Sequence, residues 1–149
     1  MNAQEQEQRQ GVVDEALTWL RTPHHHRGRL KGVGVDCLTF PAMVYQAVGL
    51  VPLLPELEYS EQWFLHKSEE IVLIWVVKYG REIKGPPLPG DLVLYQYGHC
   101  FSHGGIVLDW PQIIHAIYHR AVEFDDGEHL VINGHRPKQR KFYRYQGWD

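Results

Sequence analysis

The sequence has few of the features that mark exported, membrane-spanning or disulfide-rich proteins. Its 149 residues include two cysteines, Cys37 and Cys100, too few for a disulfide framework. The polar start, 1–10, has neither the basic nor the apolar region of a secretory signal. The longest apolar run, 71–77, has seven residues, whereas a membrane-spanning helix needs about twenty. We therefore expect synthesis in the cytoplasm, no membrane span and reduced thiols.

Basic charge is also scarce. Lys and Arg number 15 against 18 for Asp and Glu, which gives a net charge of −3, and no basic block is present. This excludes the electrostatic footprint of a nucleic-acid-binding protein. With 44% hydrophobic and 12% aromatic residues the composition is that of a globular protein. The length suits one domain, so we predict a single domain over 1–149.

Hydrophobic periodicity divides the chain into a helical first half and a strand-rich second half. A segment with three prolines, 85–90, separates them, and 22–35 is predicted to be an exposed loop. The order of elements predicts an α+β fold with an antiparallel sheet. Helices are predicted over 3–20, 37–48 and 60–84, and strands over 91–95, 102–108, 112–117, 120–124 and 141–145.

Cys37 is the candidate nucleophile. It is predicted to open a helix, with Asp36 as N-cap and Gly49 as the stop. Unpaired N–H groups and the helix dipole at that position favour a thiolate and can hold an oxyanion. The competing interpretation is that Cys37 is a small buried side chain at a helix start.

Two histidines could serve that thiol. His103 and His115 lie on strands that are expected to form a hairpin about Trp110, with paired residue numbers summing to about 220. Strand alternation then places both imidazoles on one face and within reach of each other. His103 would take the thiol proton, and His115 would orient the ring of His103. Taken alone, each histidine is better explained as a structural or surface residue, and only the combination with Cys37 favours catalysis.

Metal binding is the alternative chemistry, because Cys100-x-x-His103 and His115-x-x-x-His119 have ligand-like spacings. No Cys-x-x-Cys pair is present, and regular strand pairing places Cys100 on the face opposite His103. We therefore expect no metal site and no cofactor, and a Cys100 thiol that lies away from the reaction.

Four blocks of the sequence stand out together: Gly34-Val35-Asp36-Cys37-Leu38, Leu88-Pro89-Gly90-Asp91-Leu92-Val93-Leu94-Tyr95, His103-Gly104-Gly105-Ile106-Val107-Leu108 and Ile113-Ile114-His115-Ala116. In these blocks, and in their order, the chain resembles the NlpC-type cell-wall cysteine peptidases. The stretch from Trp19 to Gly28 resembles the branch carried by tailed bacteriophages and gene-transfer agents as tail-associated proteins.

The resemblance implies a papain-like domain in which the nucleophile helix packs on the sheet that carries the histidines. It implies a cysteine peptidase that cuts peptide stems of peptidoglycan, commonly at the γ-D-glutamyl–diamino acid bond. Cys37 would be the nucleophile, His103 the general base and acid, and His115 the orienting residue. Asp36 matches a position that binds the stem-peptide amine in some members, and its role as N-cap is an equal alternative. Other phage tail proteins are possible partners.

Two departures from the family pattern leave a second interpretation open. Leu38-Thr39 follows the cysteine where the family usually has Ser-Gly, and His24 stands where a tyrosine often assists the oxyanion site. The His24 imidazole N–H could substitute for that tyrosine. The alternative is an inactive tail-assembly domain of the same fold. Without an export signal, carriage in a virion tail is one expected route to the cell wall.

Overall fold

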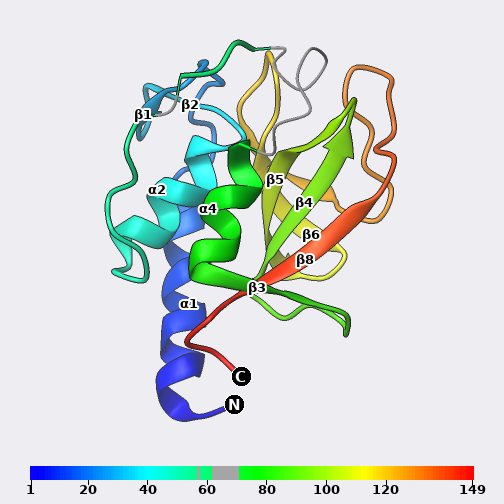
Figure 1. The fold of residues 1–149 in the computed structure, drawn as a ribbon. Coiled ribbons are helices and arrows are strands. Elements are labelled where there is room, and N and C mark those ends of the chain that lie inside the picture. The colour runs from blue at the N-terminus through cyan, green and yellow to red at the C-terminus, as the bar shows by residue number, and fades with distance from the viewer. Residues whose placement is uncertain (57, 62–70) are drawn as a thin grey trace.

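The computed structural model describes residues 1–56, 58–61 and 71–149. Within these residues it has the α+β architecture predicted from the sequence, with helices packed on an antiparallel sheet (Figure 1). The helices are α1 (Ala3–Leu17), α2 (Thr39–Ala47) and α4 (Ile71–Tyr79). The strands are β1 (Arg29–Leu30), β2 (Gly34–Val35), β3 (Gly80–Ile83), β4 (Leu92–Tyr97), β5 (Cys100–Asp109), β6 (Gln112–Ala116), β7 (Val122–Asp126) and β8 (Arg140–Tyr145).

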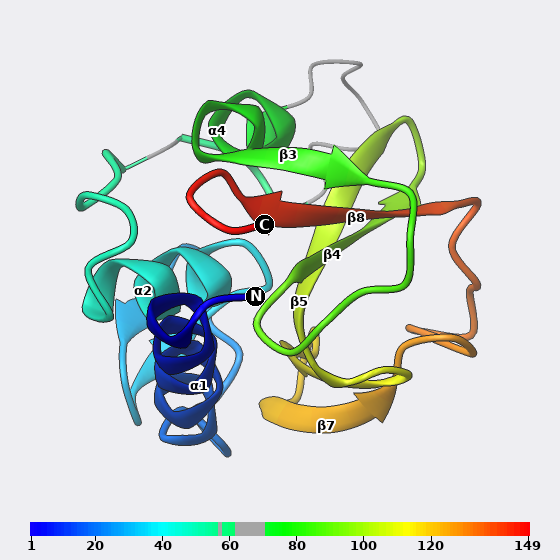
Figure 2. The ribbon, with the colours of Figure 1, turned by 90° about the horizontal axis from the view of Figure 1, so that it is seen from below.

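The main sheet has the strand order β3-β8-β4-β5-β6-β7, and each neighbouring pair is antiparallel. One face of the sheet packs against the helices. Figure 2 shows α1 and α2 beside β5, and α4 beside β3 and β8. Cross-strand pairing places Leu92, Ile106 and Ile114 on this helix-facing side, and all are buried in clusters with helix residues. The opposite face buries Val93 and Val107 under the segment that follows β7.

The predicted helix over 60–84 is only partly correct. Residues 71–79 are helical, but Gly80–Ile83 form strand β3, and 62–70 lie outside the described residues. The helix ends because the chain reaches the sheet at Gly80, where β3 pairs with β8. The loop predicted over 22–35 also contains a short hairpin, β1–β2, that the sequence pattern did not indicate. The other predicted elements are present, with ends shifted by a few residues.

A buried ion-pair network joins the start of the chain to its end. Asp91 is fully buried at the start of β4 and accepts hydrogen bonds from Arg9 of α1 (2.9 Å) and from Arg144 of β8 (2.8 and 3.1 Å). Arg9 also pairs with buried Glu5 at 2.9 Å, and Glu5 accepts the backbone N–H of Asp149. Two guanidinium groups therefore compensate the buried carboxylate, which the Pro-Gly-Asp turn places there.

None of the helices within the described residues is long and apolar enough to cross a membrane.

Removing Asp91 should therefore destabilise the fold strongly. Asp91→Ala leaves Arg9 and Arg144 without their shared carboxylate, and breaking a buried ion pair from one side costs about 3–5 kcal/mol. Urea unfolding followed by circular dichroism measures this free energy. The control is Glu123→Ala, which removes the exposed pair with Arg120 and should cost about 0–1 kcal/mol. Equal losses in the two variants would contradict this role of Asp91.

Candidate active site

The turn that carries Cys37 is built around the carboxylate of Asp36. One oxygen, Oδ1, accepts the backbone N–H groups of Leu38 (2.9 Å) and Thr39 (2.8 Å), and α2 begins at Thr39. Asp36 thus makes the hydrogen bonds to backbone N–H groups that were predicted for it as an N-cap residue. The predicted helix over 37–48 starts too early, because Cys37 lies in the turn before α2 and Leu38 occupies the cap position.

The second oxygen of Asp36 joins this turn to two other segments. Oδ2 accepts the backbone N–H of Arg27 at 2.8 Å and the hydroxyl of Tyr59 at 2.5 Å. Asp36 is only 3% exposed. Both carboxylate oxygens therefore already accept hydrogen bonds from the protein. This arrangement favours a structural role for Asp36 over direct binding of a substrate amine.

Cys37 lies directly against strand β5. Its thiol donates to the carbonyl oxygen of Ser102, with Sγ and oxygen 3.5 Å apart. Gly104, two residues further along β5, also lies beside this turn: a Cβ there would lie 3.4 Å from the carbonyl oxygen of Cys37 and 3.3 Å from the Leu94 side chain. Cys37 itself is partly exposed. Cys37 is therefore in contact with β5, the strand that carries His103.

The two histidines meet as the sequence predicted. Strands β5 and β6 pair Ile106 with Ile114 and Val107 with Ile113, the expected hairpin register. His103 Nε2 lies 2.7 Å from His115 Nδ1, and the rings are nearly perpendicular. Both residues are buried, with His115 fully so.

Asp125 extends this pair and was missed by the sequence analysis. Its Oδ2 lies 2.9 Å from His115 Nε2. Strand β7 pairs Asp125 with Ile113 and Glu123 with His115, so Asp125 is diagonal to His115 on the same face. The predicted strand ended at residue 124. Extending it by two residues and applying the same alternation would have found this carboxylate.

The chain of hydrogen bonds sets which ring nitrogens donate and which accept. The hydrogen bond from His115 holds the pKa of Asp125 below its usual value, so the carboxylate is an acceptor only. His115 must then carry its proton on Nε2 and accept at Nδ1. His103 consequently carries its proton on Nε2, and its Nδ1 has a lone pair available as a base.

The electrostatics differ from the sequence-based expectation of an ionised thiol. Burial raises the pKa of the Cys37 thiol, and the nearby Asp36 carboxylate raises it further. Backbone N–H groups of Gly104 and of Cys37 itself offset only part of this rise. The N–H groups of Leu38 and Thr39 bind Asp36 and do not face the sulfur. Burial also lowers the pKa of His103 well below its usual range, so thiol and imidazole are both neutral in this structure.

One cleft holds most of the predicted site residues. It has a volume of about 520 Å³, and Cys37, His103, His24 and Asp36 are among the residues that line it. We call it the histidine cleft. His24 packs edge-on against the ring of Tyr118, with ring centroids 5.1 Å apart. His115 lies behind His103 and is fully buried.

Cys100 does not have the placement that regular pairing predicted. The β4–β5 register shifts by one residue, so that His103 pairs with Tyr95 but Cys100 pairs with Tyr97. This irregularity places Cys100 on the same face as His103, and the side chain is fully buried. The two cysteines are not joined by a disulfide. Among the residues that the structure describes, no group of three or more His, Cys, Asp or Glu side chains is arranged to hold a metal ion.

Comparison with known proteins gives one family. The model of the NlpC/P60 family matches residues 21–136. The chain is similar to the NlpC/p60 domain of the peptidoglycan hydrolase SagA, with 19% identity and a TM-score of 0.56 over 91% of this chain and 96% of that one. It is also similar to NlpC2 from Trichomonas vaginalis, with 14% identity and a TM-score of 0.65 over 93% of this chain and 47% of that one.

A third similar structure is RipD from Mycobacterium tuberculosis, described as a non-catalytic NlpC/p60 domain protein adapted to peptidoglycan binding. It is 19% identical, with a TM-score of 0.56, over 92% of this chain and 96% of that one. No curated protein matches the sequence. At these identities, similarity to the three structures supports the fold alone. The family model, by contrast, matches most of the chain.

Because His103 is buried and neutral, the free energy of unfolding should decrease as the pH is lowered. Because its folded-state pKa is lowered, the unfolded chain binds more protons as pH falls below about 6.5, and the free energy of unfolding decreases. One extra proton bound by the unfolded chain lowers the free energy of unfolding by up to about 2 kcal/mol between pH 7.5 and pH 5. His24, whose pKa burial also lowers, acts in the same direction.

Urea unfolding at pH 5, 6 and 7.5 measures this dependence. His103→Gln should reduce the loss of stability towards pH 5, whereas the exposed His135→Gln should leave it unchanged. If the His103→Gln protein shows the same pH dependence as the wild type, the lowered pKa is wrong.

Proposed function

The chain belongs to the NlpC/P60 family, and on this premise we propose that it is a cysteine peptidase that hydrolyses peptide stems of bacterial peptidoglycan. The target we propose is the γ-D-glutamyl–diamino acid bond. The observation that carries the proposal is the hydrogen-bonded series His103–His115–Asp125, because it leaves Nδ1 of His103 without a proton, and His103 and Cys37 line the same cleft.

The reaction begins from a neutral thiol and a neutral imidazole. As Cys37 Sγ attacks the carbonyl carbon of the stem peptide, its proton passes to Nδ1 of His103. The positive charge that develops on His103 is stabilised through His115 by the carboxylate of Asp125. His103 then protonates the leaving amine, and water hydrolyses the thioester with His103 as base.

The oxyanion needs donors that Asp36 does not already use. Asp36 accepts the N–H groups of Leu38 and Thr39, so we assign this role to the backbone N–H of Cys37 and to the ring of His24, which lines the same cleft. Asp36 acts as a positioning residue that holds the Cys37 turn against β5.

An inactive domain of the same fold is the second candidate function. The raised pKa of Cys37 and the non-catalytic relative RipD favour it. In that case the histidine cleft would bind a peptide stem without cutting it. For either function we propose delivery as a phage tail-associated protein, on the resemblance of the stretch from Trp19 to Gly28 to that branch. Detection of the protein in purified virions by mass spectrometry would test this route.

Replacing Cys37 should abolish hydrolysis. With purified sacculi as substrate, Cys37→Ala should lower the release of stem fragments at least about a thousandfold, because no nucleophile remains. Mass spectrometry of the soluble fragments measures the rate and identifies the bond. The matched control is Cys100→Ala, which removes the other thiol and should retain activity if circular dichroism shows that it folds. Release by Cys37→Ala at the wild-type rate would refute the peptidase.

Replacing Asp125 should slow the reaction without removing the nucleophile. Asp125→Ala deletes the acceptor that fixes the proton on His115, and loss of such a charged hydrogen bond should lower kcat/KM about 10- to 100-fold. Asp125→Asn should be milder, because its amide oxygen can still accept the ring N–H. The control is Asp126→Asn on the same strand, whose partner is the exposed His129. Equal rates for Asp125→Ala and the wild type would exclude this role.

A further inference from the structure

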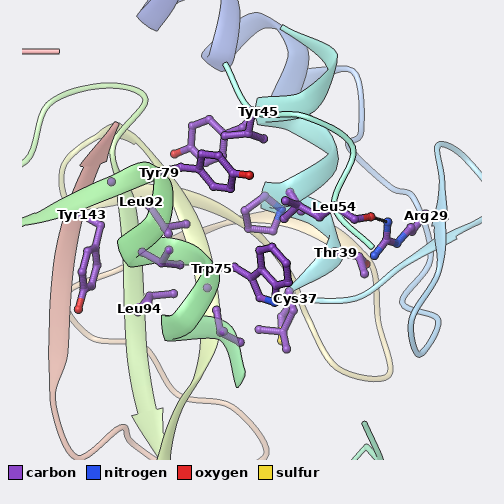
Figure 3. Close-up of a pocket in the computed structure, with 18 of the residues that line it drawn as sticks. Arg29, Cys37, Thr39, Tyr45, Leu54, Trp75, Tyr79, Leu92, Leu94 and Tyr143 are labelled. Atoms are coloured by element: carbon purple, nitrogen blue, oxygen red, sulfur yellow. Dashed lines mark hydrogen bonds between the residues drawn. The ribbon is translucent and has the colours of Figure 1, made fainter. Parts of the chain in front are cut away.

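A second cavity, separate from the histidine cleft, is also lined by Cys37. It has a volume of about 320 Å³ and lies between α2, α4 and strand β4 (Figure 3). We call it the apolar pocket. In the view of Figure 3, Trp75 lies between Cys37 and the pair Tyr45 and Tyr79. Cys37, Leu38 and Tyr59 line both this pocket and the histidine cleft, so the two cavities meet at the candidate nucleophile.

Hydrocarbon side chains and aromatic rings form most of the wall. Leu92 and Leu94 of β4 contribute from the sheet, and Trp75 and Val76 contribute from α4. Four charged residues lie at its edge: Arg144 binds Asp91, Arg29 donates to the backbone carbonyls of the segment after α2, Arg27 pairs with Glu58 at 3.8 Å, and Glu56 is exposed. A charged group placed against the hydrocarbon wall would lose water without gaining a hydrogen-bond partner there.

The unusual residues of the nucleophile segment lie in this same wall. Leu38 replaces the small polar residue that the family usually has after the cysteine, and it lines the apolar pocket. Pro41 of α2 lines it too. Leu38, Ala42 and Tyr45 follow the i, i+4, i+7 spacing of one helix face, which is the face that borders the pocket. Leu38 and Pro41 therefore add apolar surface to the pocket that Cys37 also lines.

We propose that the apolar pocket binds a linear aliphatic chain attached to the carbonyl that Cys37 attacks, so that the substrate is an acyl amide or ester. An engineered cavity of about 150 Å³ holds one benzene, so a cavity of about 320 Å³ has room for roughly a dozen carbon atoms. The inference rests on Cys37 as the nucleophile of the proposed function, and it changes the substrate from an unmodified peptide stem to an acylated one.

The chemistry is the same acyl transfer with the chain on the acyl side. Sγ of Cys37 forms a thioester with the acyl carbonyl, the bond to the amine or alcohol breaks, and His103 gives that leaving group the proton taken from the thiol. Water then adds to the thioester and gives a proton to His103, and the carbon–sulfur bond breaks. The carboxylic acid leaves, and His103 returns its proton to the sulfur.

The kinetic test is a series of p-nitrophenyl esters with acetyl, butanoyl, octanoyl, decanoyl and hexadecanoyl chains, together with the benzoyl ester. With the wild-type protein, kcat/KM should rise up to about fourfold for each added methylene and stop rising when the pocket is full. A flat series with Cys37-dependent cleavage would overturn the pocket and leave the nucleophile intact. A benzoyl ester cleaved faster than the octanoyl ester would overturn the aliphatic occupant.

Two variants with a matched control locate the effect. Ala42→Trp places a ring in the pocket and should remove the rise with chain length, and Leu38→Ser should weaken it. Ala47→Trp adds the same ring at an exposed position of the same helix, outside the pocket, and should keep the wild-type series. A series that is unchanged in Ala42→Trp and Leu38→Ser would overturn the assignment.

A binding measurement separates this proposal from the peptidase. Titration calorimetry of the Cys37→Ala protein with sodium butanoate, octanoate and decanoate needs no catalysis. Affinity that increases with chain length supports the pocket, even if sacculi are not cut. Affinity that is independent of chain length, or no binding of decanoate, overturns it, whatever the sacculus assay shows.

Discussion

The contact between the Cys37 turn and strand β5 is the constraint on which the candidate site depends. Sγ lies 3.5 Å from the carbonyl oxygen of Ser102, and Gly104 of the same strand lies beside the carbonyl oxygen of Cys37. Asp36 fixes the turn from the other side by binding the first amides of α2, Arg27 and Tyr59. Because these bonds leave the turn little freedom, the sulfur has a defined position relative to both cavities.

Patterns of alternation and order predicted the histidine arrangement well. The hairpin register followed from the spacing about Trp110, and the α+β order followed from the change in periodicity at the prolines. Features that depend on small irregularities were not predictable. One extra residue in β5 moved Cys100 to the other face, and a strand two residues longer than expected brought in Asp125. The ionisation of Cys37 depends on the backbone N–H groups of Leu38 and Thr39, which bind the Asp36 carboxylate. The sequence does not show this pairing.

The thiol of Cys37 and the imidazole of His103 are both held in their neutral forms. Burial raises the pKa of the thiol and lowers that of His103, so each shift opposes proton transfer in the absence of a substrate. Asp125, which is 34% exposed at its side chain, supplies the negative charge that an imidazolium would need. A thiol in this state is less prone to oxidation than a thiolate would be.

The ion pairs around Asp91 also bring the two chain ends together. The amino group of Met1 lies 3.6 Å from the Asp149 carboxylate, and Figure 1 shows both ends at the side of the molecule away from β1 and β2. A short peptide linker could therefore join these ends, and new termini could be opened at an exposed turn such as that between β1 and β2. The fold is in this sense suited to circular permutation, with the cut made far from the junction of Glu5, Arg9 and Arg144.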